Sequence, residues 1–224
     1  MASMRISLRL QSILHAIPLG CKVLADIGTD HGFLPIEAAL IGLCEKAIAC
    51  DINAGPLESA ARNIEAFKED LTRPVETRLG NGLAPLRENE ADCVVIAGMG
   101  GKLIMEILCA SPEKIANATL ILQPQHDLEE LRRFLHANKR TIKEVLVRES
   151  SRFYIILTAE VARGEITPWS DAEYFIGKIS GEHALLYLRE THRKIAGYIH
   201  SITDEHDKTL AQTRLAWIEQ RLKD

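Results

Sequence analysis

Short apolar runs alternate with helix-like segments along most of this chain, and this alternation constrains the fold more than any other feature. Five of the runs have the length and composition of buried strands, at residues 22–28, 46–52, 74–80, 92–98 and 118–124. Helical segments are expected at residues 33–43, 55–69, 101–109 and 127–139. Continuous apolar strands joined by helices imply a parallel sheet with both faces covered.

Two further strands are expected at residues 141–150 and 152–162, with no room for a helix between them. They therefore predict a closing antiparallel pair, whereas a plain dinucleotide-binding fold would more often continue the alternation. The expected fold class is α/β: a Rossmann-like, seven-stranded, mostly parallel sheet with helices on both faces.

Helical segments flank this core on both sides. At the start, residues 6–17 predict an amphipathic helix that ends before Gly20. After Val161 the chain becomes polar, which suggests two domains: residues 1–165, with the sheet and the first helix, and a helical domain at residues 166–224. The second domain predicts one long helix or a helical hairpin with breaks near Gly177 and Gly181. Its coiled-coil-like apolar seam consists of Leu188, Ile195, Ile199 and Ile202.

Composition narrows the class of protein. Hydrophobic residues make up 46% of the chain and charged residues 26%, which is ordinary for a globular domain. The five cysteines lack the spacing of a metal site, so no metal is expected, and they are interpreted as reduced core residues. Because no signal peptide or membrane-length apolar run is apparent, we expect a cytoplasmic protein without a membrane partner. The net charge of −4 neither supports nor excludes an RNA substrate.

The turn after the first strand carries the first chemical signal. Its residues are Asp26, Ile27, Gly28, Thr29, Asp30 and His31. Nucleotide-like ligands bind at the carboxyl ends of such strands, and a glycine there permits a tight turn and a close backbone approach. Asp30 stands where a dinucleotide fingerprint would have glycine, and its carboxylate would repel a pyrophosphate. S-adenosylmethionine is cationic and has no phosphate, so the charge favours S-adenosylmethionine over NAD.

Further polar or glycine-rich residues follow the other strands at the same expected edge. Asp51, followed by Ile52, can accept hydrogen bonds from ribose hydroxyls, and Asn81, followed by Gly82, offers a carbonyl oxygen to an adenine amino group. Each motif alone also has a plain explanation as a turn or a helix cap. Because each motif directly follows one of the expected strands, all of them should lie at one edge of the sheet, which favours a single ligand site.

Two more loops complete this edge. Ala97, Gly98, Met99 and Gly100 would allow a ligand to approach the backbone closely, and no general base or nucleophile lies among them. Gln123 and Pro124 follow the fifth strand, and the amides of Gln123 and Gln125 could hydrogen-bond the edge of a base.

The motifs D-I-G-T-D-H, G-N-G-L, A-G-M-G-G and L-Q-P together resemble the bacterial tRNA (adenine-22-N1)-methyltransferase family. The resemblance runs from about residue 5 to residue 162 and continues more weakly into the tail. It implies a Rossmann-like fold and S-adenosylmethionine as the cofactor. It also implies methyl transfer to N1 of an adenine in the D-loop of tRNA, and a helical C-terminal domain that helps to hold the tRNA.

The resemblance also implies residue roles. The cofactor site is expected to contain Asp26, Ile27, Gly28, Thr29, Asp30, His31, Asp51, Ile52, Asn81, Gly82, Ala97, Gly98 and Met99. The catalytic edge is expected to contain Asp30, Gly98, Met99, Gly100, Gln123 and Pro124. This sequence has Asn81 where the family usually has Asp, which keeps the acceptor oxygen but loses the charge. It has Gln125 where Asn is expected.

Cations outside these motifs are candidates for RNA contacts. In the first domain they are Arg5, Arg9, Arg132 and Arg133, and in the tail Arg189, Arg193 and Lys194. The tail has about as many acidic as basic residues, so a solvated helix face explains its cluster equally well. We expect a monomer or weak homodimer. Two alternatives stay open: a methyltransferase acting on another RNA or a small molecule, and a non-catalytic Rossmann-like nucleotide-binding module.

Overall fold

The computed structural model describes residue 4 and residues 6–223, so Arg5 lies outside the described residues. The strands are β1 (Cys21–Ile27), β2 (Cys44–Asp51), β3 (Val75–Leu79), β4 (Cys93–Met99), β5 (Thr119–Pro124), β6 (Arg140–Glu149) and β7 (Arg152–Val161). The helices are α1 (Leu8–Ala16), α2 (Phe33–Leu40), α3 (Ala54–Ala66), α4 (Gly101–Ala110), η1 (Pro112–Ile115), α5 (Leu128–Ala137), α6 (Asp171–Ile176), α7 (Ala184–Tyr198), η2 (Ile199–Ser201) and α8 (Glu205–Arg221).

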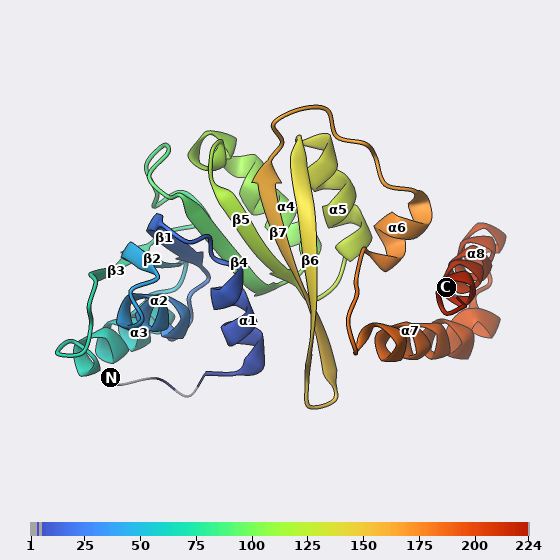
Figure 1. The fold of residues 1–224 in the computed structure, drawn as a ribbon, viewed down its shortest axis with the longest axis horizontal. Helices are drawn as coiled ribbons and strands as arrows, with labels where there is room; N and C mark the ends of the chain where they lie inside the picture. Colours follow the sequence, from blue (N-terminus) through green and yellow to red (C-terminus); the bar gives the residue numbers. More distant parts are fainter. Residues whose placement is uncertain (1–3, 5, 224) are drawn as a thin grey trace.

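The strands form one seven-stranded sheet in the order β3-β2-β1-β4-β5-β7-β6 (Figure 1). Strands β1 to β5 are parallel, and β7 pairs antiparallel with both β5 and β6. The strand order reverses between β1 and β4, which is where ligands bind in open sheets of this kind. The expected α/β fold, with its closing antiparallel pair, is confirmed.

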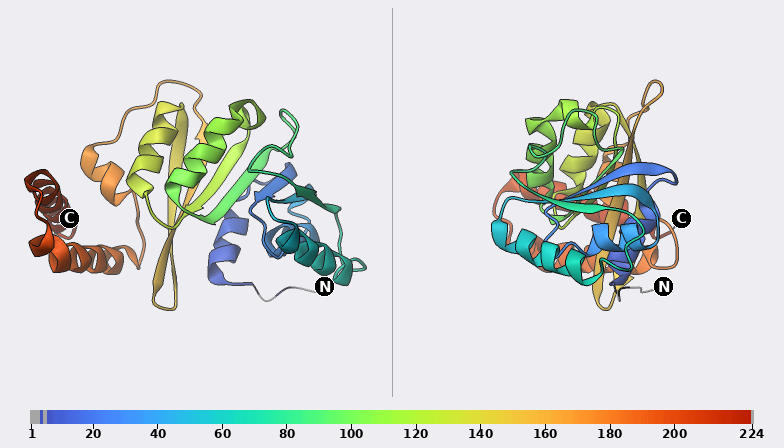
Figure 2. Two further views of the ribbon diagram at one scale, coloured as in Figure 1. Left: turned by 180° about the vertical axis from the view of Figure 1, so that it is seen from behind. Right: turned by 90° about the vertical axis from the view of Figure 1, so that its left-hand side faces the viewer.

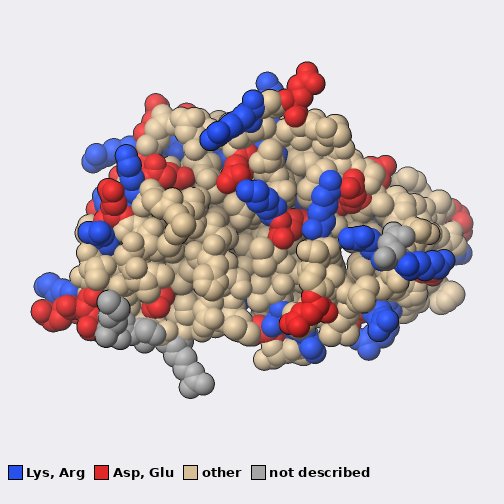
Figure 3. Space-filling view, in the orientation of Figure 1, with Lys and Arg blue, Asp and Glu red and all other residues tan. Residues whose placement is uncertain are grey.

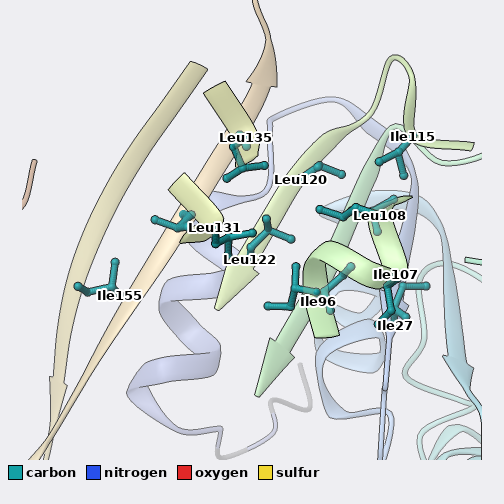
Figure 4. Packing of buried hydrophobic residues seen from close by; sticks show 14 of the residues in the cluster. Ile27, Ile96, Ile107, Leu108, Ile115, Leu120, Leu122, Leu131, Leu135 and Ile155 are labelled. Carbon is teal, nitrogen blue, oxygen red and sulfur yellow. The ribbon is translucent and has the colours of Figure 1, made fainter. Parts of the chain in front are cut away.

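Helices cover both faces of the sheet: α1, α2 and α3 lie on one face, and α4 and α5 on the other (Figure 2). Three consecutive residues of β5, Leu120, Ile121 and Leu122, are fully buried, because a parallel strand between two helical layers has no solvent side. On the α4–α5 face, the side chains of Leu131 and Leu135 lie beside those of β4 and β5 (Figure 4).

The predicted element boundaries agree with the structure within a few residues. The helix expected at residues 33–43 ends at Leu40, because Gly42 has a φ of +67°, which breaks the helical conformation. The helix expected at residues 55–69 likewise ends early, at Ala66.

Strands β6 and β7 extend beyond the rest of the sheet. Pairing between β5 and β7 ends at Leu122 and Leu157, whereas β6 and β7 remain paired as far as Glu149 and Arg152. Residues 148–154 therefore form a two-stranded projection past the carboxyl end of β5, which we call the projecting ribbon (Figure 1). Helix α1 contacts β6 and β7, and Glu149 accepts a hydrogen bond from the backbone N–H of Leu8 at 2.7 Å.

The tail consists of α6 and a hairpin of α7 and α8, so the hairpin alternative is the one observed. The expected seam lies inside it, since Leu188, Ile195 and Ile199 are buried together with Ala211 and Ile218 of α8. Figure 1 shows the hairpin at the far end of the molecule from β3.

A buried ion pair joins α5 to β6 and to α6. Arg132 Nε donates to Glu144 at 2.6 Å, and its Nη1 donates to the carbonyl oxygens of Tyr174 and Phe175. Both charged side chains are completely buried. The prediction that Arg132 contacts phosphate is therefore wrong: its guanidinium is used inside the protein. Its neighbour Arg133 is partly exposed but is paired with Glu129 and Asp171.

Candidate active site

A cavity of about 700 Å³ lies at the carboxyl edge of the sheet, where the strand order reverses. Every residue predicted to bind the cofactor lines it, from Asp26 at the end of β1 to Met99 at the end of β4. The volume is within the range of small-molecule sites. Parallel strands bring these residues together because their carboxyl ends share one edge.

Asp26 places a buried negative charge in this cavity. The carboxyl group accepts a 2.7 Å hydrogen bond from the Thr29 hydroxyl, and the residue is only 7% exposed. Burial raises the pKa of Asp26 to about 6, and the nearby Asp51 carboxylate adds to the increase. The Thr29 hydrogen bond and the Arg9 guanidinium act in the opposite direction. A cationic ligand would relieve the cost of this burial.

Glycine at residue 28 lets the Met99 side chain lie against the backbone of the cavity wall. Gly28 has a φ of +76°, and a Cβ at this position would overlap the Met99 side chain. Gly98 also has a positive φ, +77°, in the loop opposite. Backbone with a φ of this size favours glycine, because a residue with a side chain is strained there.

Asp51 ends β2 with one carboxylate oxygen committed to the protein. Oδ1 accepts a 2.8 Å hydrogen bond from the Asn53 backbone N–H, and the other oxygen has no hydrogen-bond partner among the described residues. Asn53 is the N-cap residue of α3 but makes no side-chain cap. Asn81 lies exposed on the cavity wall near Gly80 and Gly82.

Asp30 and His31 line the outer part of the cavity. Asp30 has a left-handed backbone, with a φ of 53°, and its Oδ2 lies 3.6 Å from His31 Nε2. The His31 ring stacks on Phe33, with their centroids 5.3 Å apart. Phe33 was not predicted from the sequence, although an exposed aromatic residue at the start of a helix beside the glycine turn is a usable signal.

Helix α1 contributes Arg9 to the same edge. Arg9 Nη1 donates to Gln123 Oε1 at 2.9 Å, while Gln123 Nε2 donates to the Pro124 carbonyl at 3.0 Å. Gln123 is 1% exposed, so its amide is engaged within the protein and holds Arg9 rather than presenting itself to a base. Gln125 likewise donates to the Gly98 carbonyl at 2.8 Å.

A second cavity of about 730 Å³ adjoins the first and shares Arg9, Gly98 and Gln125 with it. Gln123, Pro124 and Lys194 line only this second cavity. Gly100 lines neither cavity, and a Cβ there would overlap the His126 ring. Of the tail cations, Arg189 and Arg193 are exposed on α7 outside both cavities.

Charges elsewhere on the surface are mixed: Lys and Arg are interspersed with Asp and Glu on the face shown in Figure 3. Among the described residues, no cluster of three or more His, Cys, Asp or Glu side chains is arranged to hold a metal ion. No helix in the described part of the chain is both long and apolar enough to cross a membrane.

The sheet order, the antiparallel β7 and the cavity at the strand reversal define the class of protein: a Rossmann-like methyltransferase. Residues 6–157 match the methyltransferase domain family. The chain belongs to the tRNA (adenine-22-N1)-methyltransferase family.

Similar proteins support both the methyltransferase class and the tRNA (adenine-22-N1)-methyltransferase family. The chain is 40% identical to the tRNA (adenine(22)-N(1))-methyltransferase of Bacillus subtilis, over 71% of this chain and 67% of the relative. It is also similar to the solved structure of the B. subtilis m1A22 tRNA methyltransferase TrmK, with a TM-score of 0.77, 30% identity and 99% and 97% of the two chains covered. The Streptococcus pneumoniae protein Sp1610 in complex with S-adenosyl-L-methionine gives a TM-score of 0.84, 30% identity and coverage of 97% and 99%.

Proposed function

We propose that this protein transfers a methyl group from S-adenosylmethionine to N1 of adenine 22 in tRNA. The observation that carries the proposal is the cavity at the strand reversal, which is lined by the buried carboxyl groups of Asp26 and Asp51. The substrate and the modified position come from the relatives, whose names specify adenine 22 of tRNA.

The residues present fit this cofactor. Asp26 is a buried carboxylate whose neighbours only partly compensate its charge, which suits the ammonium group of the methionine part. The free oxygen of Asp51 suits ribose hydroxyls, and the Asn81 amide oxygen suits the adenine amino group. The cavity also has apolar walls, supplied by Phe33, Leu103 and Ile107.

The acceptor chemistry makes modest demands on the protein. S-adenosylmethionine, when bound, supplies the electrophilic methyl group that the in-plane lone pair of adenine N1 takes up. The bond from the methyl group to sulfur breaks as the bond to N1 forms, S-adenosylhomocysteine leaves, and the positive charge passes to the methylated base, so the transfer itself requires no proton removal. The task of the protein is then to position the base and exclude water. This agrees with the absence of a nucleophile or general base in the loop of residues 97–101. Since the base edge of a tRNA residue is paired or stacked, the base must first be exposed.

We assign the catalytic edge to Asp30, Gly98 and Met99 at the first cavity, with Gln123 and Pro124 at the second. Gln123 acts through Arg9, as a positioning residue. We further propose a boundary between domains near residue 165, a monomer or weak homodimer, and action in the cytoplasm, where tRNA is modified.

Incubation of unmodified tRNA with methyl-labelled S-adenosylmethionine, followed by digestion to nucleosides, tests the proposal. We expect label in 1-methyladenosine, and none when the tRNA carries G at position 22. Label in a different nucleoside, or equal labelling of the G22 tRNA, would point to another acceptor. No cofactor binding at millimolar concentration in calorimetry would favour the non-catalytic module.

A further inference from the structure

The second cavity lies between two structural units that are distant in sequence. The projecting ribbon supplies Arg152, Phe153 and Tyr154, and α7 supplies Tyr187, Glu190, Thr191 and Lys194. The rings of Phe153 and Tyr187 join the units in an edge-to-face contact, with centroids 5.5 Å apart. Helix α7 is therefore a wall of this cavity as well as part of the tail.

The side chains of the cavity combine aromatic rings with positive charge. Two of the chain's four tyrosines line this cavity, Tyr154 from the ribbon and Tyr187 from α7. Arg9 lies over the Tyr154 ring, 5.8 Å from its centroid, at the junction with the first cavity. Rings beside cations are the combination that binds an unpaired nucleotide, because bases stack on rings and phosphates attract cations.

Two cations in this cavity are free to bind a ligand. Arg152 and Lys194 are both exposed, and neither belongs to an ion pair within the described part of the chain. Arg133, by contrast, is paired with two carboxylates. One free cation comes from the ribbon and the other from α7, so each wall presents one. Glu190 is the one acidic side chain that lines the cavity among the residues that the structure describes.

We propose that the second cavity holds the acceptor nucleotide, with the base against the Tyr154 ring and with Arg152 and Lys194 on the adjoining phosphates. This inference rests on the proposed function and deepens it. It makes α7 part of the acceptor site. The tail would then contact the acceptor nucleotide itself as well as more distant parts of the RNA. Arg9, which is hydrogen-bonded to Gln123, lies where the second cavity adjoins the first.

The phosphate contacts are tested with Arg152→Ala, Lys194→Ala and the double variant. Matched controls are Lys143→Ala, at the opposite end of the β6–β7 pair, and Lys208→Ala on α8, both outside the cavity. Each single cavity variant should raise the KM for tRNA by roughly 3- to 10-fold. It should also reduce the slope of log binding constant against log salt concentration by about one, the value for one lost phosphate contact. The controls should change neither quantity, and cofactor affinity should stay constant in all variants.

The stacking surface is tested by comparing Tyr154→Phe with Tyr154→Leu. The phenylalanine keeps the ring, so its kcat/KM for tRNA should stay within about twofold of wild type. The leucine keeps an apolar side chain but has no ring, and its kcat/KM should fall by roughly 5- to 100-fold. Thermal unfolding and cofactor titration of both variants establish that the fold and the first cavity are intact.

The results separate this inference from the proposed function. If the wild-type protein methylates tRNA but the Arg152, Lys194 and Tyr154 variants match their controls, the acceptor lies elsewhere and the inference is overturned. If free adenosine is methylated as efficiently as tRNA, phosphate contacts are irrelevant and the inference also fails. If the wild-type protein binds cofactor but labels no tRNA, it is the proposed function that fails, and the inference with it.

Discussion

Arg9 and Gln123 are separated by 114 positions in the sequence, yet a 2.9 Å hydrogen bond joins the Arg9 guanidinium to the Gln123 amide oxygen. The bond ties α1 to the carboxyl end of β5, at the junction of the two cavities. Arg9 is thereby fixed close enough to Asp26 to lower the pKa of that carboxyl group against the effect of burial.

Replacing Gln123 should release Arg9 without removing it. For Gln123→Leu we expect kcat/KM for tRNA to fall about tenfold, since a hydrogen bond to a charged group is worth roughly 1.5–3 kcal/mol. Steady-state kinetics measures the loss, and Arg9→Lys serves as a control that keeps the charge but not the fork of donors. An unchanged kcat/KM in Gln123→Leu would show that the amide does not position Arg9.

Asp26→Asn should change cofactor affinity and the free energy of unfolding in opposite directions. Loss of the carboxylate should weaken S-adenosylmethionine binding by at least about tenfold, because the ligand loses a buried counter-charge. At pH 7.5 the same change should raise the free energy of unfolding by about 1–3 kcal/mol, because the buried ionised group is removed. Calorimetry and denaturant titration measure the two effects. Weaker binding accompanied by lower stability would instead indicate a damaged fold.

The raised pKa of Asp26 predicts a pH dependence of binding. A cation binds the ionised carboxylate, so affinity should be constant above about pH 7 and should fall as the pH drops through 6. Between pH 7 and pH 5 the loss should be about tenfold, from the ionised fraction alone. The free energy of unfolding of the ligand-free protein should change in the opposite direction. It should rise as the pH falls from about 6 towards 4, because the cost of ionising the buried Asp26 disappears. Asp26→Asn should remove both dependences, and a flat wild-type binding profile would refute the assignment.

Gly28→Ala should damage the cofactor cavity directly. The positive φ strains any residue with a side chain, so we expect a stability loss of about 1–3 kcal/mol, and a Cβ would also push the end of the Met99 side chain out of its place at the cavity. Cofactor affinity should fall more than in Gly164→Ala, a control at a surface glycine where a Cβ meets nothing within 4 Å. Equal affinities in the two variants would contradict the role given to Gly28.

The buried Arg132–Glu144 pair predicts a non-additive pair of substitutions. Arg132→Met alone should cost about 3–5 kcal/mol of unfolding free energy, since Glu144 would be left buried and uncompensated. The double variant Arg132→Met with Glu144→Leu should recover much of that loss. Denaturant unfolding of both variants and wild type completes the cycle; additive losses would mean that the two charges are not coupled.

The residues of the first cavity could be predicted from the sequence because they follow consecutive parallel strands. Asp26, Asp51 and Gly98 lie far apart in the chain, but the topology alone brings the ends of their strands to one edge. The closing antiparallel pair was equally predictable, because two strands followed each other without an intervening helix.

The second cavity was not predictable in the same way. It depends on how α1, the projecting ribbon and α7 pack together, and no periodic pattern encodes that packing. Arg132 shows the same limit of sequence-based prediction. It lies next to Arg133 on a polar helix, and this local sequence predicts an exposed side chain. Only Glu144 of β6 and the carbonyl groups of Tyr174 and Phe175 make its burial favourable.

A crystal structure with bound S-adenosylmethionine would test the central claim most directly. We predict that the ribose hydroxyls contact Asp51, that the ammonium group lies near Asp26, and that the methyl group faces the boundary of the two cavities at Gly98. A cofactor bound at any other place, or one that leaves Asp51 and the loop of residues 97–101 on opposite sides of the molecule, would contradict this account.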